Sequence, residues 1–386
     1  MIYWEICVIK CIALSILGIV LMVTGLEASQ RHVPDKILTR KVAIHFNGEK
    51  INGYYVLTDT RSEQELDADE IRGSLNGPAI VFFSGHGQRP ADAHKFSSEL
   101  ALKSRSGFVI VPVCDTPYGS DPNWRGDRGK EVVLMAMIRY ILAQSGIRLE
   151  GYASLDDISV KIQGFEISEC PDSISTQLVA VGWSHGGILA RRFCCAYPDV
   201  TLGLAQVCPA GYERWSEVGL LLNFLGESLR ISKIGFTGYT GDVLRSGWGL
   251  TKGIVGDFVR SIPSALVHLQ PGKCSRVCKD IQDCTLYCDD QNFPLLRLRN
   301  IVVVFARDDT CMDPAQSGVA DLFQPLPAEV NAFWHKYFPG ALQTGTRCTL
   351  QFLPGTHAAP VTHNKQYAHI VLKGLDLFAM SEEKMR

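Results

Sequence analysis

The spacing of apolar and polar positions predicts buried strands that alternate with helices. Short runs rich in Val, Ile and Leu occupy residues 78–84, 107–113, 175–182, 200–206, 298–305 and 347–353. Segments with helical spacing of apolar side chains occupy residues 91–103, 129–144, 188–197, 328–337 and 362–380. Near-continuous apolar strands separated by helices are typical of a mostly parallel sheet with helices on both faces. We therefore predict an α/β fold of this kind.

Three segments interrupt the alternation. Residues 41–46 and 54–58 flank an Asn-Gly turn, which predicts a β-hairpin ahead of the parallel strands. Residues 148–172 are irregular and acidic, and they predict a surface insertion. Residues 211–292 contain apolar and glycine-rich stretches and then a cysteine cluster, which favours a cap or lid inserted between two late strands. The predicted domains are a core of residues 41–210 and 293–386 and a cap of residues 211–292.

The first thirty residues form a separate unit. Residues 11–26 are uncharged and mostly apolar, with Lys10 before them and a polar run after them. This length fits the core of a signal peptide and is short for a membrane span, which needs roughly 20 apolar residues. Residues 1–30 are therefore predicted to be a signal peptide or an N-terminal membrane anchor. We expect a protein that is exported (secreted or periplasmic) or tethered to the membrane, and cleavage of the segment stays open.

The cysteines agree with export. Of 13 cysteines in the chain, four form a cluster with three, five and three residues between them: Cys274, Cys278, Cys284 and Cys288. In an oxidising compartment such a cluster favours two nested disulfide bridges. Zinc is the alternative, although structural zinc sites favour closer cysteine pairs.

Charge excludes one class of partner. The chain carries 38 Lys and Arg against 40 Asp and Glu, with a net charge of −2. Proteins that bind nucleic acid usually carry a basic patch or stripe, because they neutralise phosphates. No nucleic-acid partner is expected.

The most informative motif is Gly182-Trp183-Ser184-His185-Gly186, which follows an apolar strand and precedes a helical stretch. A serine at such a strand-to-helix turn is held in a strained conformation that exposes its hydroxyl, and glycines on both sides avoid steric collisions. Ser184 is therefore the candidate nucleophile.

A serine nucleophile needs a base to accept its proton and an acid to orient that base. His357 lies in the loop after the last predicted strand and is the candidate base. Asp309 follows the penultimate strand and is the favoured acid, with Asp308 as the alternative and Asp313 behind both. All lie at carboxyl ends of strands, where sites form in open α/β sheets. The weaker candidates are His363 and His369 as base and Glu213 as acid.

Acyl transfer also requires donors for the oxyanion of the tetrahedral intermediate. The residue after the nucleophile usually supplies one backbone N–H, here that of His185. The strand at residues 78–84 is followed by His86-Gly87, where the glycine allows the next amide, that of Gln88, to turn inward. The predicted oxyanion hole is thus formed by the amides of His185 and Gln88.

Together these motifs resemble those of serine hydrolases with the α/β-hydrolase fold, of the esterase or lipase type. The matching residues are His86-Gly87, the 182–186 motif, Asp309 and His357, and residues 115–120 stand where that family has an Asp-x-x-Gly-x-Ser-like loop. The resemblance spans residues 41–380, with the cap unmatched. It implies an acyl-enzyme mechanism that needs no metal and no organic cofactor.

The expected function is hydrolysis of carboxylic esters, with a small-molecule or lipid ester as substrate. The alternatives are an acyltransferase or peptidase on the same triad, and a non-catalytic binding protein that keeps the fold. The natural substrate, the acyl acceptor and the oligomeric state stay open at this stage.

Overall fold

The computed structural model describes residues 37–46, 49–64, 66–67, 75–85, 90–114, 129–147, 160–163, 165–166, 176–212 and 298–378. Several predicted features lie outside these residues: the N-terminal segment 1–30, the loop of residues 86–88 with Gln88, the loop 115–120, Glu213, nearly all of the cap at 211–292 and the cysteine cluster at 274–288.

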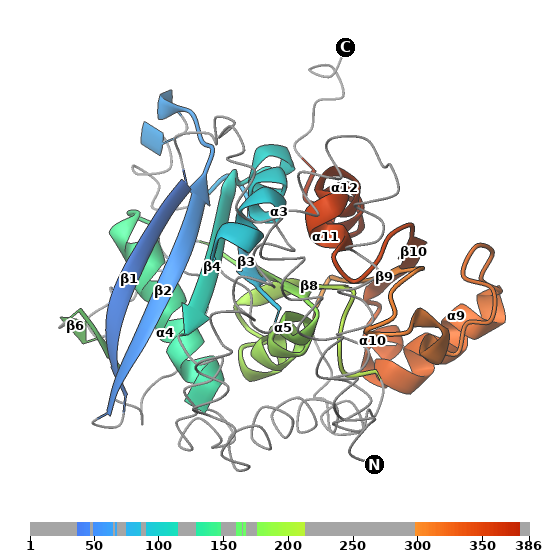
Figure 1. The fold of residues 1–386 in the computed structure, drawn as a ribbon. Helices are drawn as coiled ribbons and strands as arrows, with labels where there is room; N and C mark the ends of the chain where they lie inside the picture. Colours follow the sequence, from blue (N-terminus) through green and yellow to red (C-terminus); the bar gives the residue numbers. More distant parts are fainter. Residues whose placement is uncertain are drawn as a thin grey trace, which may run out of the picture.

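Within the described residues, the core of the fold is one open sheet of 10 strands in the order β10-β9-β8-β7-β3-β4-β2-β1-β5-β6 (Figure 1). Its parallel strands are β3 (Ala79–Phe83), β4 (Phe108–Cys114), β7 (Leu178–Trp183), β8 (Thr201–Val207), β9 (Asn300–Ala306) and β10 (Arg347–Leu353). At the other end, β2 (Glu49–Asp59) pairs antiparallel with both β4 and β1 (Ile37–Phe46). This is the strand order of the α/β-hydrolase fold, so the predicted fold class is confirmed.

The outer edge of the sheet differs from the prediction for residues 148–172. Part of this segment forms β5 (Val160–Ile162) and β6 (Phe165–Glu166), and β5 extends the sheet beyond β1. The prediction of an irregular surface insertion is therefore wrong for these residues. Strands of three and two residues are too short to show an apolar period. β5 is held at the edge of the sheet by pairing with β1, where Ile162 lies beside Ile44.

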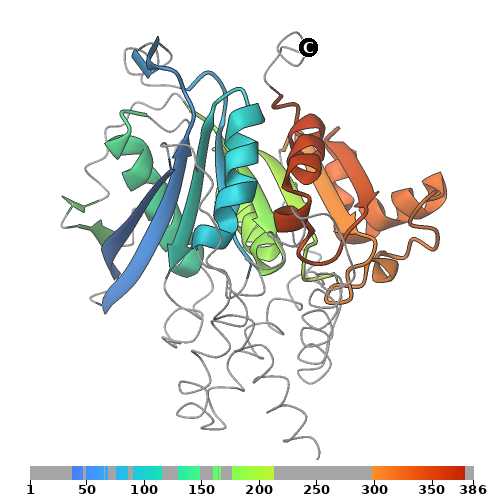
Figure 2. The ribbon, with the colours of Figure 1, turned by 45° about the horizontal axis from the view of Figure 1, so that its top comes forward.

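Helices cover both faces of the sheet (Figure 2). On one face lie α4 (Gly129–Gln144), α5 (His185–Ala196), α9 (Pro327–Tyr337) and α10 (Pro339–Gln343). On the other lie α3 (Pro90–Lys103), α11 (Ala359–Thr362) and α12 (Asn364–Gly374). Successive side chains of each strand point to opposite faces, so every central strand contributes to both apolar cores.

The closing helix is shorter than the predicted 362–380. His363, with φ −122°, separates the short α11 from α12. Asp376 adopts a left-handed conformation with φ 59° soon after α12, which ends the helix because few residues other than glycine favour that region. The apolar spacing continues across both breaks, so it could not reveal them.

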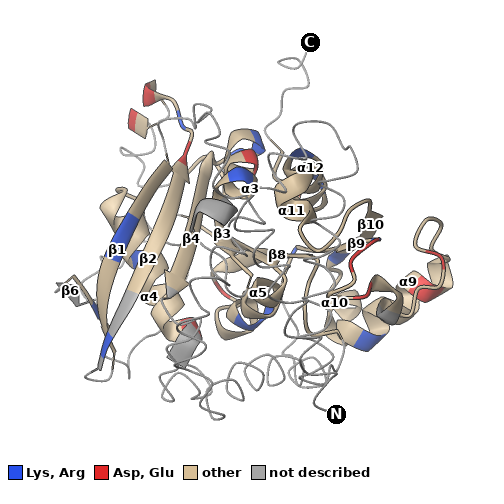
Figure 3. Cartoon of the chain, in the orientation of Figure 1, with Lys and Arg blue, Asp and Glu red and all other residues tan. Residues whose placement is uncertain are grey.

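The described part of the chain also shows how charged residues are distributed, whether a helix could span a membrane, and the state of its cysteines. Lys and Arg are interspersed with Asp and Glu along its elements, and most of the ribbon carries neither (Figure 3). None of the described helices is both long enough and apolar enough to span a membrane. Cysteines of this part are present as thiols, namely Cys194, Cys195, Cys208, Cys311 and Cys348.

The packing of α3 on the sheet predicts a contrast between two neighbouring leucines. Leu100 is fully buried (0% exposed), whereas Leu102 is 57% exposed on the same helix. We expect Leu100→Ala to lower the free energy of unfolding by about 2–5 kcal/mol, and Leu102→Ala to change it by less than about 0.5 kcal/mol. Urea unfolding of both variants measures the difference, and equal losses would contradict this packing.

Candidate active site

The candidate nucleophile lies at a strained turn between β7 and α5. Ser184 has φ 55° and ψ −126°, a conformation that costs a residue other than glycine about 1–3 kcal/mol. Hydrogen bonds hold the turn on both sides: the Ser184 N–H donates to the Val207 carbonyl (3.0 Å), and the Ser184 carbonyl accepts from Gly187 (2.9 Å) and Ala210 (3.1 Å). The neighbouring strand and helix therefore impose the conformation of the serine.

Two glycines of the motif are required by close backbone contacts. A Cβ atom on Gly182 would lie 2.1 Å from the carbonyl oxygen of Gly186. A Cβ atom on Gly186 would lie 2.0 Å from the carbonyl oxygen of Phe83 in β3. The first turn of α5 thus rests directly on the ends of β7 and β3, and no larger residue fits at either position.

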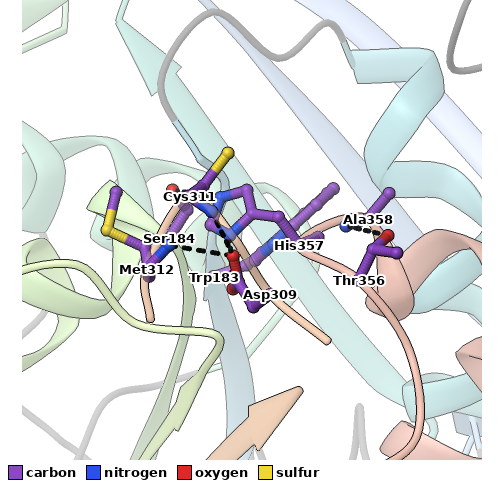
Figure 4. Close-up of polar contacts among 8 residues, drawn as sticks. All are labelled: Trp183, Ser184, Asp309, Cys311, Met312, Thr356, His357 and Ala358. Carbon is purple, nitrogen blue, oxygen red and sulfur yellow. Dashed lines mark hydrogen bonds and ion pairs between the residues drawn. The ribbon is translucent and has the colours of Figure 1, made fainter. Parts of the chain in front are cut away.

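Ser184, His357 and Asp309 form one continuous hydrogen-bonded relay (Figure 4). The Nε2 atom of His357 lies 2.8 Å from the Ser184 Oγ atom, and its Nδ1 atom lies 2.8 Å from the Asp309 Oδ2 atom. A carboxylate only accepts hydrogen bonds, so Nδ1 carries the imidazole proton. The Nε2 lone pair then faces the serine hydroxyl, which is the arrangement a base needs.

The carboxylate of Asp309 is fixed on both oxygens. Its side chain is 1% exposed, and the Oδ1 atom accepts backbone N–H bonds from Cys311 and Met312, each 2.9 Å long (Figure 4). A buried charge is costly unless it is paired and hydrogen-bonded, and these bonds with His357 meet that requirement. The carboxylate is therefore held in place and almost completely buried.

The structure separates the two neighbouring acids. Asp308, the alternative acid, is exposed and contacts the base loop instead of the imidazole: its N–H donates to the Gly355 carbonyl (3.0 Å), and its Oδ2 atom accepts from the Gly355 N–H (3.4 Å). Asp313 lies further along and caps a short 3₁₀ helix by accepting from Ala315 N–H (2.9 Å).

The weaker base candidates point elsewhere. His363 lies between α11 and α12, with its Nδ1 atom 2.9 Å from the Thr362 hydroxyl, and burial lowers its pKa. His369 packs its ring against Phe378, and burial lowers its pKa, with the charges of Lys103 and Lys373 adding to the effect. Among the histidines in the described part of the chain, His357 is the one whose ring forms a hydrogen bond with Ser184.

Only one of the two predicted oxyanion donors lies within the described residues. His185 is the first residue of α5, so its amide lies at the positive end of the helix dipole directly after Ser184. Gln88 lies outside the described residues, and its role stays a prediction. Phe83, the last residue of β3, lies against the turn of residues 182–186, here called the elbow, so the chain leaves β3 close to Ser184.

The contacts that hold the loop carrying His357 were not predicted from the sequence. The Trp183 Nε1–H donates to the carbonyl oxygen of His357 (3.0 Å), and the Tyr367 hydroxyl donates to that of Pro354 (3.2 Å). Burial raises the pKa of Tyr367, which keeps the hydroxyl a neutral donor. The strand period could have shown which face Trp183 occupies, but no local pattern identifies its partner.

Comparison with known proteins gives likenesses of fold alone. No protein-family model matches the sequence, and a comparison with curated protein sequences found no match. Among solved structures, it is similar to a membrane phospholipase A described as a bacterial virulence factor (13% identity, 97% of this chain and 98% of that chain, TM-score 0.47). It is also similar to a thermophilic esterase from Thermogutta terrifontis (13%, 87% and 98%, TM-score 0.48). A third is carboxyl esterase 2 from Tuber melanosporum (13%, 91% and 89%, TM-score 0.46). Because these TM-scores are below 0.5, the fold assignment rests on the strand order of the sheet and on the elbow, not on these likenesses.

The strained turn predicts how stability responds to substitution of Ser184. Alanine tolerates φ 55° no better than serine, whereas glycine adopts positive φ without steric conflict. We expect Ser184→Gly to be more stable than Ser184→Ala by about 1 kcal/mol, because relief of strain exceeds the entropy lost by glycine on folding. Urea unfolding compares the two variants. A Ser184→Gly protein less stable than Ser184→Ala would show that the turn stores no strain.

Proposed function

We propose that this chain is a serine hydrolase that cleaves carboxylic esters through an acyl-enzyme intermediate. One observation carries the proposal: Ser184, on a strained turn, shares a hydrogen bond with the neutral nitrogen of an imidazole whose other nitrogen is bound to a buried carboxylate. A purely structural serine needs neither this conformation nor a base beside it, so the arrangement supports an activated nucleophile.

The first half-reaction follows from the relay. The Ser184 Oγ atom attacks the acyl carbonyl carbon while its proton passes to the Nε2 atom of His357. Asp309 accepts from Nδ1–H and stabilises the positive imidazolium without itself taking the proton. When the tetrahedral intermediate collapses, the leaving alcohol receives the Nε2 proton, and the acyl group stays bonded to Ser184.

The second half-reaction releases the acid. Water gives its proton to Nε2 and attacks the acyl-enzyme, and the Ser184 oxygen then recovers that proton as the ester bond breaks. In both half-reactions the negative charge develops on the former carbonyl oxygen. We assign its stabilisation to the amide of His185 and, as the second donor, to that of Gln88.

The substrate class is part of the proposal. The apolar and glycine-rich character of residues 211–292 favours an ester with an apolar acyl group, either a small molecule or a lipid. The apolar N-terminal segment favours export or membrane tethering, which would bring the enzyme to such substrates. Turnover of p-nitrophenyl esters of increasing chain length tests the acyl preference, and equal rates for all lengths would count against a lipid substrate.

The test of the nucleophile is covalent labelling. We expect a fluorophosphonate to modify the protein at Ser184, as located by peptide mapping, and Ser184→Ala to abolish both labelling and ester hydrolysis. Because the change removes one hydroxyl from the elbow, we expect the melting temperature to stay within a few degrees. Folded wild-type protein that resists labelling would instead favour a non-catalytic binding role.

The two adjacent aspartates give a matched pair. Asp309→Asn should lower kcat by about 10⁴-fold, because an amide can hold the imidazole in the wrong tautomer. Asp308→Asn keeps the exposed side chain and the Gly355 contact, and we expect kcat within about threefold of the wild type, since the exposed acid does not face the imidazole. Steady-state hydrolysis measures both, and an equal loss would contradict the assignment of Asp309 as the acid.

A further inference from the structure

We propose that Trp183 is a positioning residue that fastens the loop of the base to the strand of the nucleophile. The inference rests on the proposed function, because it assigns a role within the same relay. Trp183 immediately precedes Ser184 in the chain, yet its side chain reaches the opposite member of the hydrogen-bonded pair, His357.

The register of β7 directs the indole to the base loop. Alternate residues of this strand pack on opposite faces, and Val179, Val181 and Trp183 belong to the core beneath α3, α11 and α12. The same core contains Ala358 and Ala359, which directly follow His357. The backbone therefore turns at Ser184 toward α5, while the preceding side chain stays on the face that carries the base loop (Figure 4).

The contact combines a hydrogen bond with ring packing. The Trp183 Nε1–H donates to the carbonyl oxygen of His357 over 3.0 Å, and the two ring centroids lie 6.2 Å apart. Trp183 is 3% exposed and His357 is 8% exposed, so water cannot readily replace the lost donor. A carbonyl left unpaired in such a place is costly, and the loop would shift to satisfy it.

Other contacts fix the loop to different elements. The Tyr367 hydroxyl of α12 donates to the carbonyl of Pro354, and Asp308, in the turn after β9, forms hydrogen bonds with the backbone of Gly355. The Ala358 N–H donates to the Thr356 hydroxyl within the loop (3.3 Å). Trp183 additionally connects the loop to β7, so a movement of the strand that precedes Ser184 would also move the imidazole of His357.

We expect the hydrogen bond between Trp183 and His357 to affect the rate of the chemical step. Proton transfer depends on the distance between Oγ and Nε2, and misplacement by about 1 Å can lower a rate by about 10²-fold. Binding of the acyl group does not involve the indole N–H in this arrangement, because that hydrogen is already bonded to His357. Loss of the donor should therefore slow bond formation and leave probe affinity unchanged.

The experiment compares two tryptophan-to-phenylalanine variants of the full chain. Trp183→Phe keeps an aromatic ring and removes the N–H, and Trp334→Phe makes the same change at a buried position of α9 (4% exposed) that packs against Phe333 and Phe338. Fluorophosphonate labelling is followed over a range of probe concentrations, which separates the maximal rate constant from the apparent affinity. Melting temperatures are measured for both.

We expect Trp183→Phe to lower the maximal labelling rate by about 10- to 100-fold with an affinity within twofold of the wild type. Trp334→Phe should label like the wild type. A Trp183→Phe protein with a wild-type rate, or with weaker affinity as its main change, would overturn the inference. A matching loss in Trp334→Phe would do the same, since it would indicate a general packing effect.

Two further measurements cover the remaining outcomes. If Trp183→Phe does not fold, Trp183→Tyr replaces it, and failure of both to fold would overturn the inference in favour of a core role. If the wild type does not label, the proposed function fails by itself. The NMR signal of the His357 Nδ1 proton, assigned by its absence in His357→Gln, then decides: we expect Trp183→Phe to shift it, and an unchanged signal would overturn the inference.

Discussion

The close approach of α5 to β3 at the end of β7 is the constraint on which the site depends. Because the backbones of Gly182, Gly186 and Phe83 come so near one another, the chain has no room for a relaxed turn at Ser184. Packing of the sheet and helix therefore fixes the position of the Ser184 hydroxyl, and the stability of the whole core offsets the strain at this turn. The rest of the relay is built onto this fixed point from the carboxyl ends of later strands.

The relay members differ in how they are held. Ser184 is fixed by backbone geometry, and Asp309 is fixed by two backbone amides and the imidazole. His357 lies on a loop, so its position depends on side chains contributed by other elements, among them Trp183. Loops are the more variable parts of a fold, and although His357 is buried, its position is the one in the relay that substitutions in neighbouring side chains can change most directly.

Local patterns predicted much of this arrangement. The helix at residues 129–144 and the strand at residues 347–353 have the predicted bounds. The helix is a long run of mostly apolar residues, and the strand alternates Cys348, Leu350 and Phe352 with polar residues. Strands β5 and β6 were missed because so few residues define no period. The contact of Trp183 with His357 was beyond prediction for another reason: the residues are 174 positions apart, and only the folded sheet brings them together.

The same separation in sequence bears on how the protein is made. The bond between Ser184 and His357 joins positions 173 apart, and β9 must dock beside β8 although residues 208–299 lie between them in the chain. Contacts so distant in the chain form slowly, because a long loop must close before they contribute. During synthesis the elbow emerges well before β10 and the loop of the base. A growing chain therefore contains Ser184 long before it contains His357, so the hydrogen-bonded relay can form only after the last strand and its following loop have been made.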